Sequence, residues 1–158
     1  MNTKADAAKS KDVLAMLTED HARVKAMFEQ FATLGERAHV GKRKLADEIC
    51  NELSIHATLE EELFYPAVRG AGKDNLDLVD EAIVEHAAAR DLIAQIRAAD
   101  VRDELFDAKV KVLAEQIAHH VGEEETEIFP KARKSKLDLV ELGEQAAGRK
   151  AQLATQPA

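Results

Sequence analysis

Apolar residues recur at steps of three, four and seven along most of the chain, which is the period of one face of an α-helix. This period predicts four long helices, over about residues 13–36, 42–69, 76–99 and 100–128. A shorter helix is expected over about 136–147. The segments 38–41 and 70–75 carry the glycines that favour breaks between helices.

Four helices of similar length joined by short breaks predict an all-α fold, an up-and-down four-helix bundle with a short C-terminal tail helix. A helical-repeat solenoid is the alternative, but two repeat units are too few to build one. We therefore expect residues 1–12 to form a flexible N-terminus and residues 13–133 to form the bundle. Residues 134–158 would contribute the tail helix and a frayed C-terminus. Pro66 should end or kink the second helix near its end.

A short motif occurs twice. Residues 56–66 (HATLEEELFYP) and 120–130 (HVGEEETEIFP) both follow the pattern H-x3-E-x5-P, with an aromatic residue before the proline. The two copies are 64 residues apart. The first and third predicted helices carry a matching histidine each, His21 and His86, which are 65 residues apart. Two copies in register are far more specific than a single H-x3-E pair, which is usually a surface hydrogen bond.

The spacing of these residues places them on the apolar faces of their helices. Residues i and i+4 share one helix face, so each motif histidine and its glutamate point the same way, in line with apolar neighbours. A buried carboxylate or imidazole needs a partner, and a pair of metal ions would serve all of these groups at once. We expect each ion to take two histidines and to share two glutamates. The predicted metal ligands are His21, His56, Glu60, His86, His120 and Glu124.

The donor set narrows the choice of metal. Two imidazoles and a carboxylate with open positions favour non-haem iron, and the lack of a thiolate in the set disfavours a structural zinc site. Zn or Mn could replace iron with the same ligands. We assign no catalytic residue beyond the predicted ligands.

Several other polar residues have a structural interpretation. His39 is expected in a solvated loop, and His119, one residue off the apolar face, is expected at the rim of the site. The acidic residues Glu61, Glu62, Glu123 and Glu125 form runs that should face solvent, although one of these carboxylates could hold a ligand imidazole by its second nitrogen. Tyr65 should pack in the core, because an ideal helix rotates it away from Glu60, with a position beside the metals as the alternative.

Composition limits the class of protein. The chain has 158 residues, 46% of them hydrophobic, and a net charge of −8, which suits one domain and argues against nucleic-acid and anionic-membrane partners. No apolar run approaches the about 20 residues of a membrane span, and the N-terminus lacks the apolar stretch of a signal peptide. The single cysteine, Cys50, favours a reducing compartment. We therefore expect a cytoplasmic protein.

Over about residues 13–133 the chain resembles the hemerythrin-like, HHE cation-binding family. The resemblance rests on two triplets, His21, His56, Glu60 and His86, His120, Glu124. It implies a four-helix bundle around a carboxylate-bridged centre of two iron ions. It also implies reversible chemistry with dioxygen, peroxide or nitric oxide.

The chain departs from the oxygen-carrying hemerythrins at two positions. Arg90 stands where those proteins have a fifth histidine, and Glu124 lies four residues after its histidine, where theirs is an aspartate five residues after. This difference argues against simple oxygen carriage and favours sensing, scavenging or iron handling, with peroxide- or nitric-oxide-consuming activity left open. The alternative function is metal storage, or a metal-stabilised module that binds a protein partner. The sequence does not specify the oligomeric state.

Overall fold

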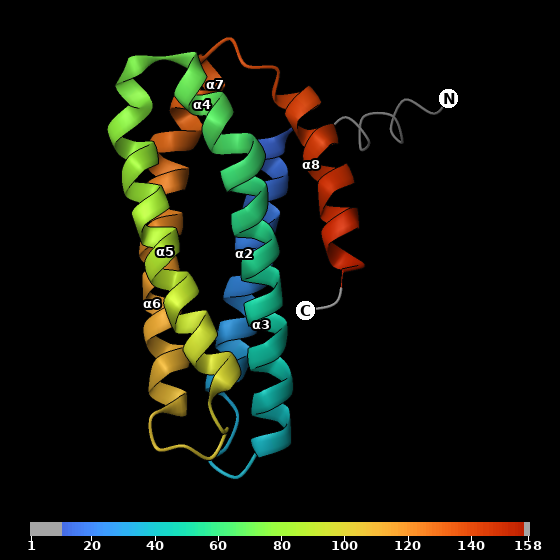
Figure 1. Ribbon diagram of the computed structural model, residues 1–158, viewed down its shortest axis with the longest axis vertical. Coiled ribbons are helices and arrows are strands. Elements are labelled where there is room, and N and C mark those ends of the chain that lie inside the picture. The colour runs from blue at the N-terminus through green and yellow to red at the C-terminus, as the bar shows by residue number, and fades with distance from the viewer. Residues whose placement is uncertain (1–10, 157–158) are drawn as a thin grey trace.

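Four long helices run side by side in the computed structural model, which describes residues 11–156 (Figure 1). They are α2 (Val13–Ala32), α3 (His39–Leu59), α5 (Leu76–Ala98) and α6 (Phe106–Glu123). Within residues 11–156 every regular element is helical and no β-strand occurs, so the all-α prediction is confirmed. Most of the predicted N-terminal segment, residues 1–10, lies outside the described residues.

Two of the long helices pass through a π-helical turn and continue. The chain of α3 leads through η1 (Glu60–Phe64) into α4 (Tyr65–Ala71), and that of α6 leads through η3 (Glu124–Ile128) into α7 (Phe129–Lys134). The helices therefore do not end at Pro66 or Pro130, because each proline falls in the first turn of the following helix. Backbone N–H groups in the first turn of an α-helix have no partner within the helix, so a proline in that turn costs no hydrogen bond. A short 3₁₀ turn, η2 (Lys73–Asn75), precedes α5.

Some predicted boundaries are wrong by several residues. The first break lies at residues 33–38, not 38–41, because Thr33 ends α2 by donating its hydroxyl to Gln30 O, and His39 already begins α3. His39 is therefore a half-buried helix residue rather than a loop histidine. The fourth helix begins at Phe106, since the Asp100 side chain accepts the Arg102 N–H at 2.8 Å and forms a separate turn.

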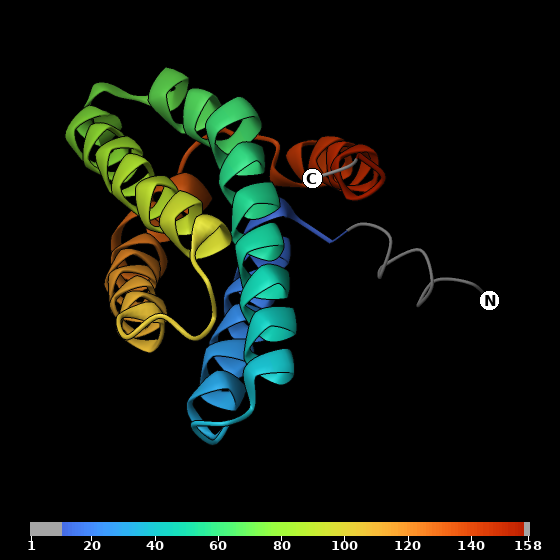
Figure 2. The same cartoon turned by 60° about the horizontal axis from the view of Figure 1, so that its bottom comes forward.

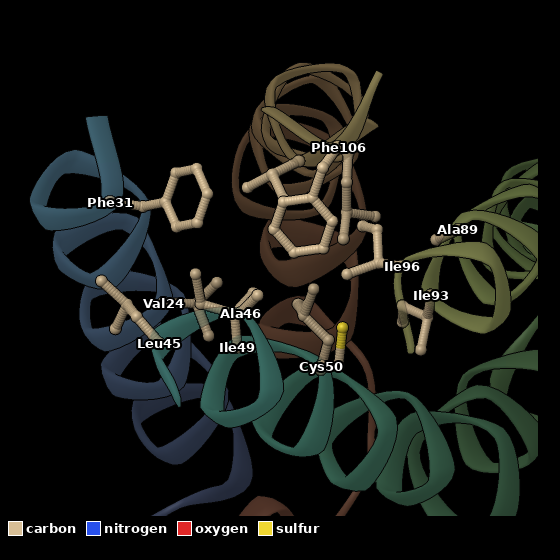
Figure 3. Packing of buried hydrophobic residues seen from close by; sticks show 13 residues of the cluster. Val24, Phe31, Leu45, Ala46, Ile49, Cys50, Ala89, Ile93, Ile96 and Phe106 are labelled. Atoms are coloured by element: carbon tan, nitrogen blue, oxygen red, sulfur yellow. The ribbon is translucent and has the colours of Figure 1, made fainter. Parts of the chain in front are cut away.

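The helical core consists of two apolar clusters separated by a polar layer. One cluster lies toward the α2–α3 and α5–α6 connections and packs Phe31 and Phe106 with aliphatic side chains from all four long helices (Figure 3). The other lies toward α4 and α7 and contains Leu17, Phe64 and Tyr65. Burial of both clusters supplies the hydrophobic free energy that holds the helices together. The polar groups between them are consequently sealed from water at both ends.

A fifth long helix, α8 (Leu139–Ala154), packs outside α2 and α3 in both views (Figures 1 and 2). Its N-terminus is capped by the Asp138 side chain, which accepts the Glu141 N–H at 3.0 Å. The helix covers residues 139–154 rather than the predicted 136–147. Among the described residues no helix combines the length and apolarity that a membrane crossing requires.

The docking of α8 depends on a glycine. A Cβ atom at Gly143 would lie 2.5 Å from Lys11 O and 3.1 Å from Val13 N, both of them backbone atoms at the start of α2. The Gly148 position in the same helix has no such neighbour within 4 Å. Gly143 therefore allows α8 to approach the backbone of α2 closely.

We predict that Gly143→Ala lowers the free energy of unfolding by about 1–3 kcal/mol, because the added methyl group must push α8 away from α2. The control is Gly148→Ala, which should raise the free energy of unfolding by about 0.5–1 kcal/mol, since alanine stabilises an open helix position. Urea unfolding of the three proteins at one metal concentration measures both effects. Equal stability of the two variants would contradict the close contact.

Candidate metal centre

Each of the helices α2, α3, α5 and α6 contributes one histidine to the polar layer between the two clusters. His21 on α2, His56 on α3, His86 on α5 and His120 on α6 are all 6–8% exposed. The glutamates that follow two of them, Glu60 and Glu124, open the π-helical turns and are 0% exposed. The structure thus brings all six predicted side chains together in the interior. Their role as metal ligands stays a prediction, which is developed below.

The six side chains form two groups that share the carboxylates. In the first, His21 Nε2 lies 3.2 Å from His56 Nε2 and 3.1 Å from Glu124 Oε1, and His56 Nε2 lies 3.4 Å from Glu60 Oε2. In the second, His86 Nε2 lies 3.2 Å from His120 Nε2 and 3.1 Å from Glu60 Oε1. Glu124 Oε2 lies 3.4 Å from His120 Nε2. Each carboxylate therefore gives one oxygen to each group.

The donor atoms fit two cations. Glu60 Oε2 and Glu124 Oε1 are buried and accept no hydrogen bond of good geometry among the described residues, although His56 Nε2 and His21 Nε2 lie 3.4 and 3.1 Å from them. An ionised oxygen without a partner is unfavourable in the interior, and paired imidazole nitrogens at 3.2 Å need a proton or a cation between them. Two imidazoles and two carboxylate oxygens per group meet both needs if a metal ion sits in each.

The π-helical turn brings Tyr65 beside the six side chains, which is the position given above as the alternative, while its ring also packs in the apolar cluster with Phe64. The Tyr65 N–H bonds to Glu60 O, five residues back, and this wider turn rotates Tyr65 onto the face of Glu60. Its hydroxyl donates to Glu124 Oε2 at 2.5 Å and lies 3.2 Å from both His86 Nε2 and His120 Nε2.

The corresponding turn in the second motif places Phe129 in the first group. The Phe129 N–H bonds to Glu124 O, and its ring stacks on His21 with centroids 5.8 Å apart and an interplanar angle of 8°. The two halves of the centre therefore differ in one respect. The phenol of Tyr65 lies beside His86 and His120, whereas an apolar ring lies beside His21.

Each of the four histidines contacts a carboxylate through its Nδ1 atom. The distances are 2.8 Å from His21 to Glu125, 3.0 Å from His56 to Asp20, 2.7 Å from His86 to Glu61 and 2.6 Å from His120 to Glu85. Such carboxylates fix the orientation and tautomer of a metal-binding imidazole and raise its basicity. The arrangement leaves each Nε2 free to bind a cation.

Sequence reasoning found only part of this outer layer. The acidic runs contain Glu61 and Glu125, one in each motif, as the second interpretation of those runs anticipated. Asp20 and Glu85 were missed as partners, although each directly precedes a predicted ligand histidine, His21 or His86. That repeated adjacency, in both halves of the chain, is the signal that could have identified them.

Buried charge shifts the ionisation of the centre. Burial disfavours the charged form of His56, but the Glu60 carboxylate and the hydrogen bond to Asp20 raise its pKa to about 10. Burial is likewise outweighed at His120, whose interactions with Glu124 and Glu60 raise its pKa to about 11. Burial raises the pKa of Glu60, but His56 and His120 outweigh this effect and hold its pKa well below its usual range. Without metal, protons on these imidazoles thus balance the buried carboxylates.

Tyr65 stays neutral in this environment. Burial and the negative charges of Glu60 and Glu124 raise the pKa of its phenol far above the usual range. Cys50 stays protonated too, since burial in the apolar cluster raises the pKa of its thiol to about 11. The phenol is therefore a hydrogen-bond donor inside the centre, and the thiol is a packing group outside it.

A small cavity adjoins the four histidines. It has a volume of about 30 Å³, and its other walls are mostly apolar side chains, including Val24, Leu53, Ile93 and Ile117. Arg90 reaches its edge and donates to Glu61 Oε1 at 3.1 Å. The cavity has room for a molecule of about the size of water.

Comparison with known proteins agrees with this architecture. The model of the hemerythrin HHE cation-binding domain matches residues 12–132. A DNA nickase of Nostoc is 30% identical over 125 residues, which are 77% of this chain but 33% of the nickase, so the chain spans about a third of that relative. The uncharacterized protein Rv2633c of Mycobacterium tuberculosis is also 30% identical over 125 residues, 77% of this chain and 73% of Rv2633c.

A solved structure has a similar fold over most of its length. It is the crystal structure of a hemerythrin HHE cation-binding domain-containing protein, the Rv2633c homolog from Mycobacterium kansasii. That structure aligns with a TM-score of 0.75 at 25% identity and covers 90% of this chain and 87% of its own. Since the family model spans both histidine–glutamate motifs and their partner histidines, the chain belongs to the hemerythrin HHE cation-binding family.

Proposed function

We propose that the protein holds two iron ions and uses them to bind, or react with, dioxygen, peroxide or nitric oxide, in sensing, scavenging or iron handling. The observation that carries this proposal is the sharing of two fully buried carboxylates, Glu60 and Glu124, by two pairs of histidines. The chain would then be an up-and-down four-helix bundle, with α8 as its tail helix. The single-cysteine argument for a cytoplasmic location stays a prediction.

The proposed ligands divide between the two ions. His21 and His56 would hold one ion, His86 and His120 the other, and the two glutamates would bridge them. The bound ions supply redox chemistry and open coordination positions for a small molecule. The same nitrogen and oxygen donors also accept Zn or Mn, so the metal taken up depends on supply as well as on the ligands.

The chain's own groups select and position the small molecule. The cavity of about 30 Å³ beside the histidines has room for a molecule of a few atoms. The Tyr65 hydroxyl, held at 2.5 Å from Glu124 Oε2, keeps a proton available in the second half. The two apolar clusters keep bulk water away from both halves. These features suit a dry centre for a diatomic ligand or peroxide.

A second candidate function is metal storage, or structural stabilisation of a module that binds another protein. It is favoured by the depth of the centre, since none of the six proposed ligands is more than 8% exposed. Metal bound there would stabilise the fold strongly, because it binds only the folded state. The two functions differ in whether external ligands reach the metal.

We expect freshly purified protein to contain two iron ions per chain and to change its visible spectrum with air, peroxide or nitric oxide.

His56→Ala should lose iron, because it removes a proposed ligand, whereas His39→Ala should keep it. Metal analysis and absorption spectra measure both. Iron-loaded protein whose spectrum responds to none of the three ligands would support the second function instead, and unchanged iron content in His56→Ala would contradict the ligand assignment.

Metal binding should release protons. The raised pKa values of His56 and His120, about 10 and 11, leave both imidazoles protonated at pH 7 in the metal-free protein, and a metal must displace both protons. We therefore expect release of two protons when Zn²⁺ binds, measured by calorimetry in buffers of different ionisation enthalpy. Metal affinity should rise with pH up to about these two values.

The metal-free protein should show the opposite trend in stability. Folding raises both pKa values above the about 6.5 of free histidine, so it favours the protonated imidazoles. Their contribution to the free energy of unfolding is present below pH 6.5 and is lost as the pH rises toward 10 and 11. Binding of Zn²⁺ with no proton release, or constant stability over this range, would show that the imidazoles are already neutral.

The carboxylates behind the histidines should strengthen metal binding. We predict that Glu125→Gln weakens it by about tenfold to a hundredfold, because the amide no longer polarises the His21 imidazole. Glu127→Gln, in the same π-helical turn but exposed, is the matched control and should leave the affinity unchanged. Competition with a chelator for bound Zn²⁺ compares the two variants, and equal affinities would contradict a role for Glu125.

A further inference from the structure

A second group of metal-type donors lies outside the centre, where α5 and α6 meet. His119 Nε2 lies 2.9 Å from Glu123 Oε1 and 3.7 Å from Glu85 Oε2, and the three donor atoms lie within 4.8 Å of one another. The His119 side chain is 68% exposed, so the group faces solvent. We call Glu85, His119 and Glu123 the surface triad.

Glu85 connects the surface triad to the buried centre. Its Oε1 atom accepts the His120 Nδ1–H at 2.6 Å, while its Oε2 atom belongs to the triad. A groove of about 200 Å³ runs beside it and is lined by two of the triad residues, Glu85 and His119, together with His86 and His120. Gln116 also lines this groove, and its Oε1 atom is buried with no hydrogen-bond partner among the described residues. The groove thus joins the triad to the second half of the centre and contains a further unused oxygen donor.

The charge of the surface triad is not balanced by basic side chains. Among the described residues, the ion pairs of Glu85 and Glu123 involve only histidines. Two of the other carboxylates behind the centre differ, since Asp20 pairs with Arg23 and Lys150, and Glu61 pairs with Arg90, whereas Glu125, like Glu85, pairs only with a histidine. Two carboxylates around one imidazole therefore leave a negative site that a cation would neutralise.

The internal duplication supplies a comparison within the chain. The positions that correspond to His119 and Glu123 in the first motif are Ile55 and Leu59, which cannot bind a cation. On that side α8 packs against α2 and α3, and its Lys150 donates to Asp20 at 2.8 Å. The surface triad is thus specific to the second half and is not a by-product of the duplication.

We propose that the surface triad is a third cation site, through which a divalent first-row metal ion enters the His86–His120 half of the centre. Two carboxylates and one imidazole form a suitable set for Fe²⁺, Zn²⁺ or Mn²⁺, with water in the open positions. Glu85 faces both sites, so it can release the ion on one side while holding His120 on the other. The entry role rests on the proposed buried metal centre, whereas cation binding by the triad does not.

The test uses the full-length, metal-free protein and Zn²⁺. Calorimetric titration should find three equivalents bound in the wild type, the third more weakly than the first two. Glu123→Gln and His119→Gln should each bind two equivalents, with the third site weakened at least about tenfold by the lost ligand. Glu144→Gln, the same charge change at an exposed position of α8, should still bind three.

The entry role is tested by the rate at which metal reaches the buried centre. Uptake of Co²⁺ into the buried centre, followed by its visible absorption, should slow at least about tenfold in Glu123→Gln and stay unchanged in Glu144→Gln. The proposal would be overturned if the wild type bound only two equivalents of Zn²⁺, or if Glu123→Gln took up Co²⁺ at the wild-type rate. If the wild type bound a single equivalent of Zn²⁺ and His119→Gln bound none, the buried centre would be overturned instead. Urea unfolding of each metal-free variant shows whether the substitution lowers the stability of the fold, which could by itself reduce metal binding.

Discussion

Two carboxylates, Glu60 and Glu124, are held in the middle of the protein with no exposure to solvent. A charge in that position is tolerated only if opposite charge and hydrogen bonds surround it, and the rest of the structure meets this condition. Four imidazoles point their Nε2 atoms at the carboxylate oxygens, and His56 and His120 carry protons when no metal is present. Metal ions bound at these imidazoles would therefore compete with protons for the same positions.

The groups around the centre form layers, and each layer fixes the position or environment of the groups inside it. Apolar clusters above and below exclude water, outer carboxylates orient the imidazoles, and the imidazoles define where a cation can sit. The two halves follow one plan but are not identical. Tyr65 places a phenol beside one pair of histidines, and Phe129 places an apolar ring beside the other. Two ions bound there would have different surroundings despite having the same ligand types.

Much of this arrangement is predictable from the sequence, because periodicity and spacing depend only on regular helix geometry. The apolar stripes predicted the long helices, and the repeated motif predicted which six side chains meet. The position of Tyr65 beside the centre was predicted only as an alternative, because the main interpretation assumed an α-helix, whereas a π-helical turn rotates it onto the face of Glu60. Asp20 and Glu85 escaped because each acts across a helix–helix contact, on His56 and His120, rather than on its own helical neighbour. Spacing within one helix does not identify such partners, and the only sequence signal is that each carboxylate directly precedes His21 or His86.

The contact between α8 and Asp20 ties the C-terminal helix to the metal centre. Lys150 and His56 bind the two oxygens of one carboxylate, so the docked helix and the oriented imidazole share a single anchor. Thermodynamic linkage is reciprocal. Any factor by which docking of α8 strengthens metal affinity must equal the factor by which bound metal tightens that docking. Loss of metal from the buried centre would then loosen α8, and this change would be detectable at the protein surface.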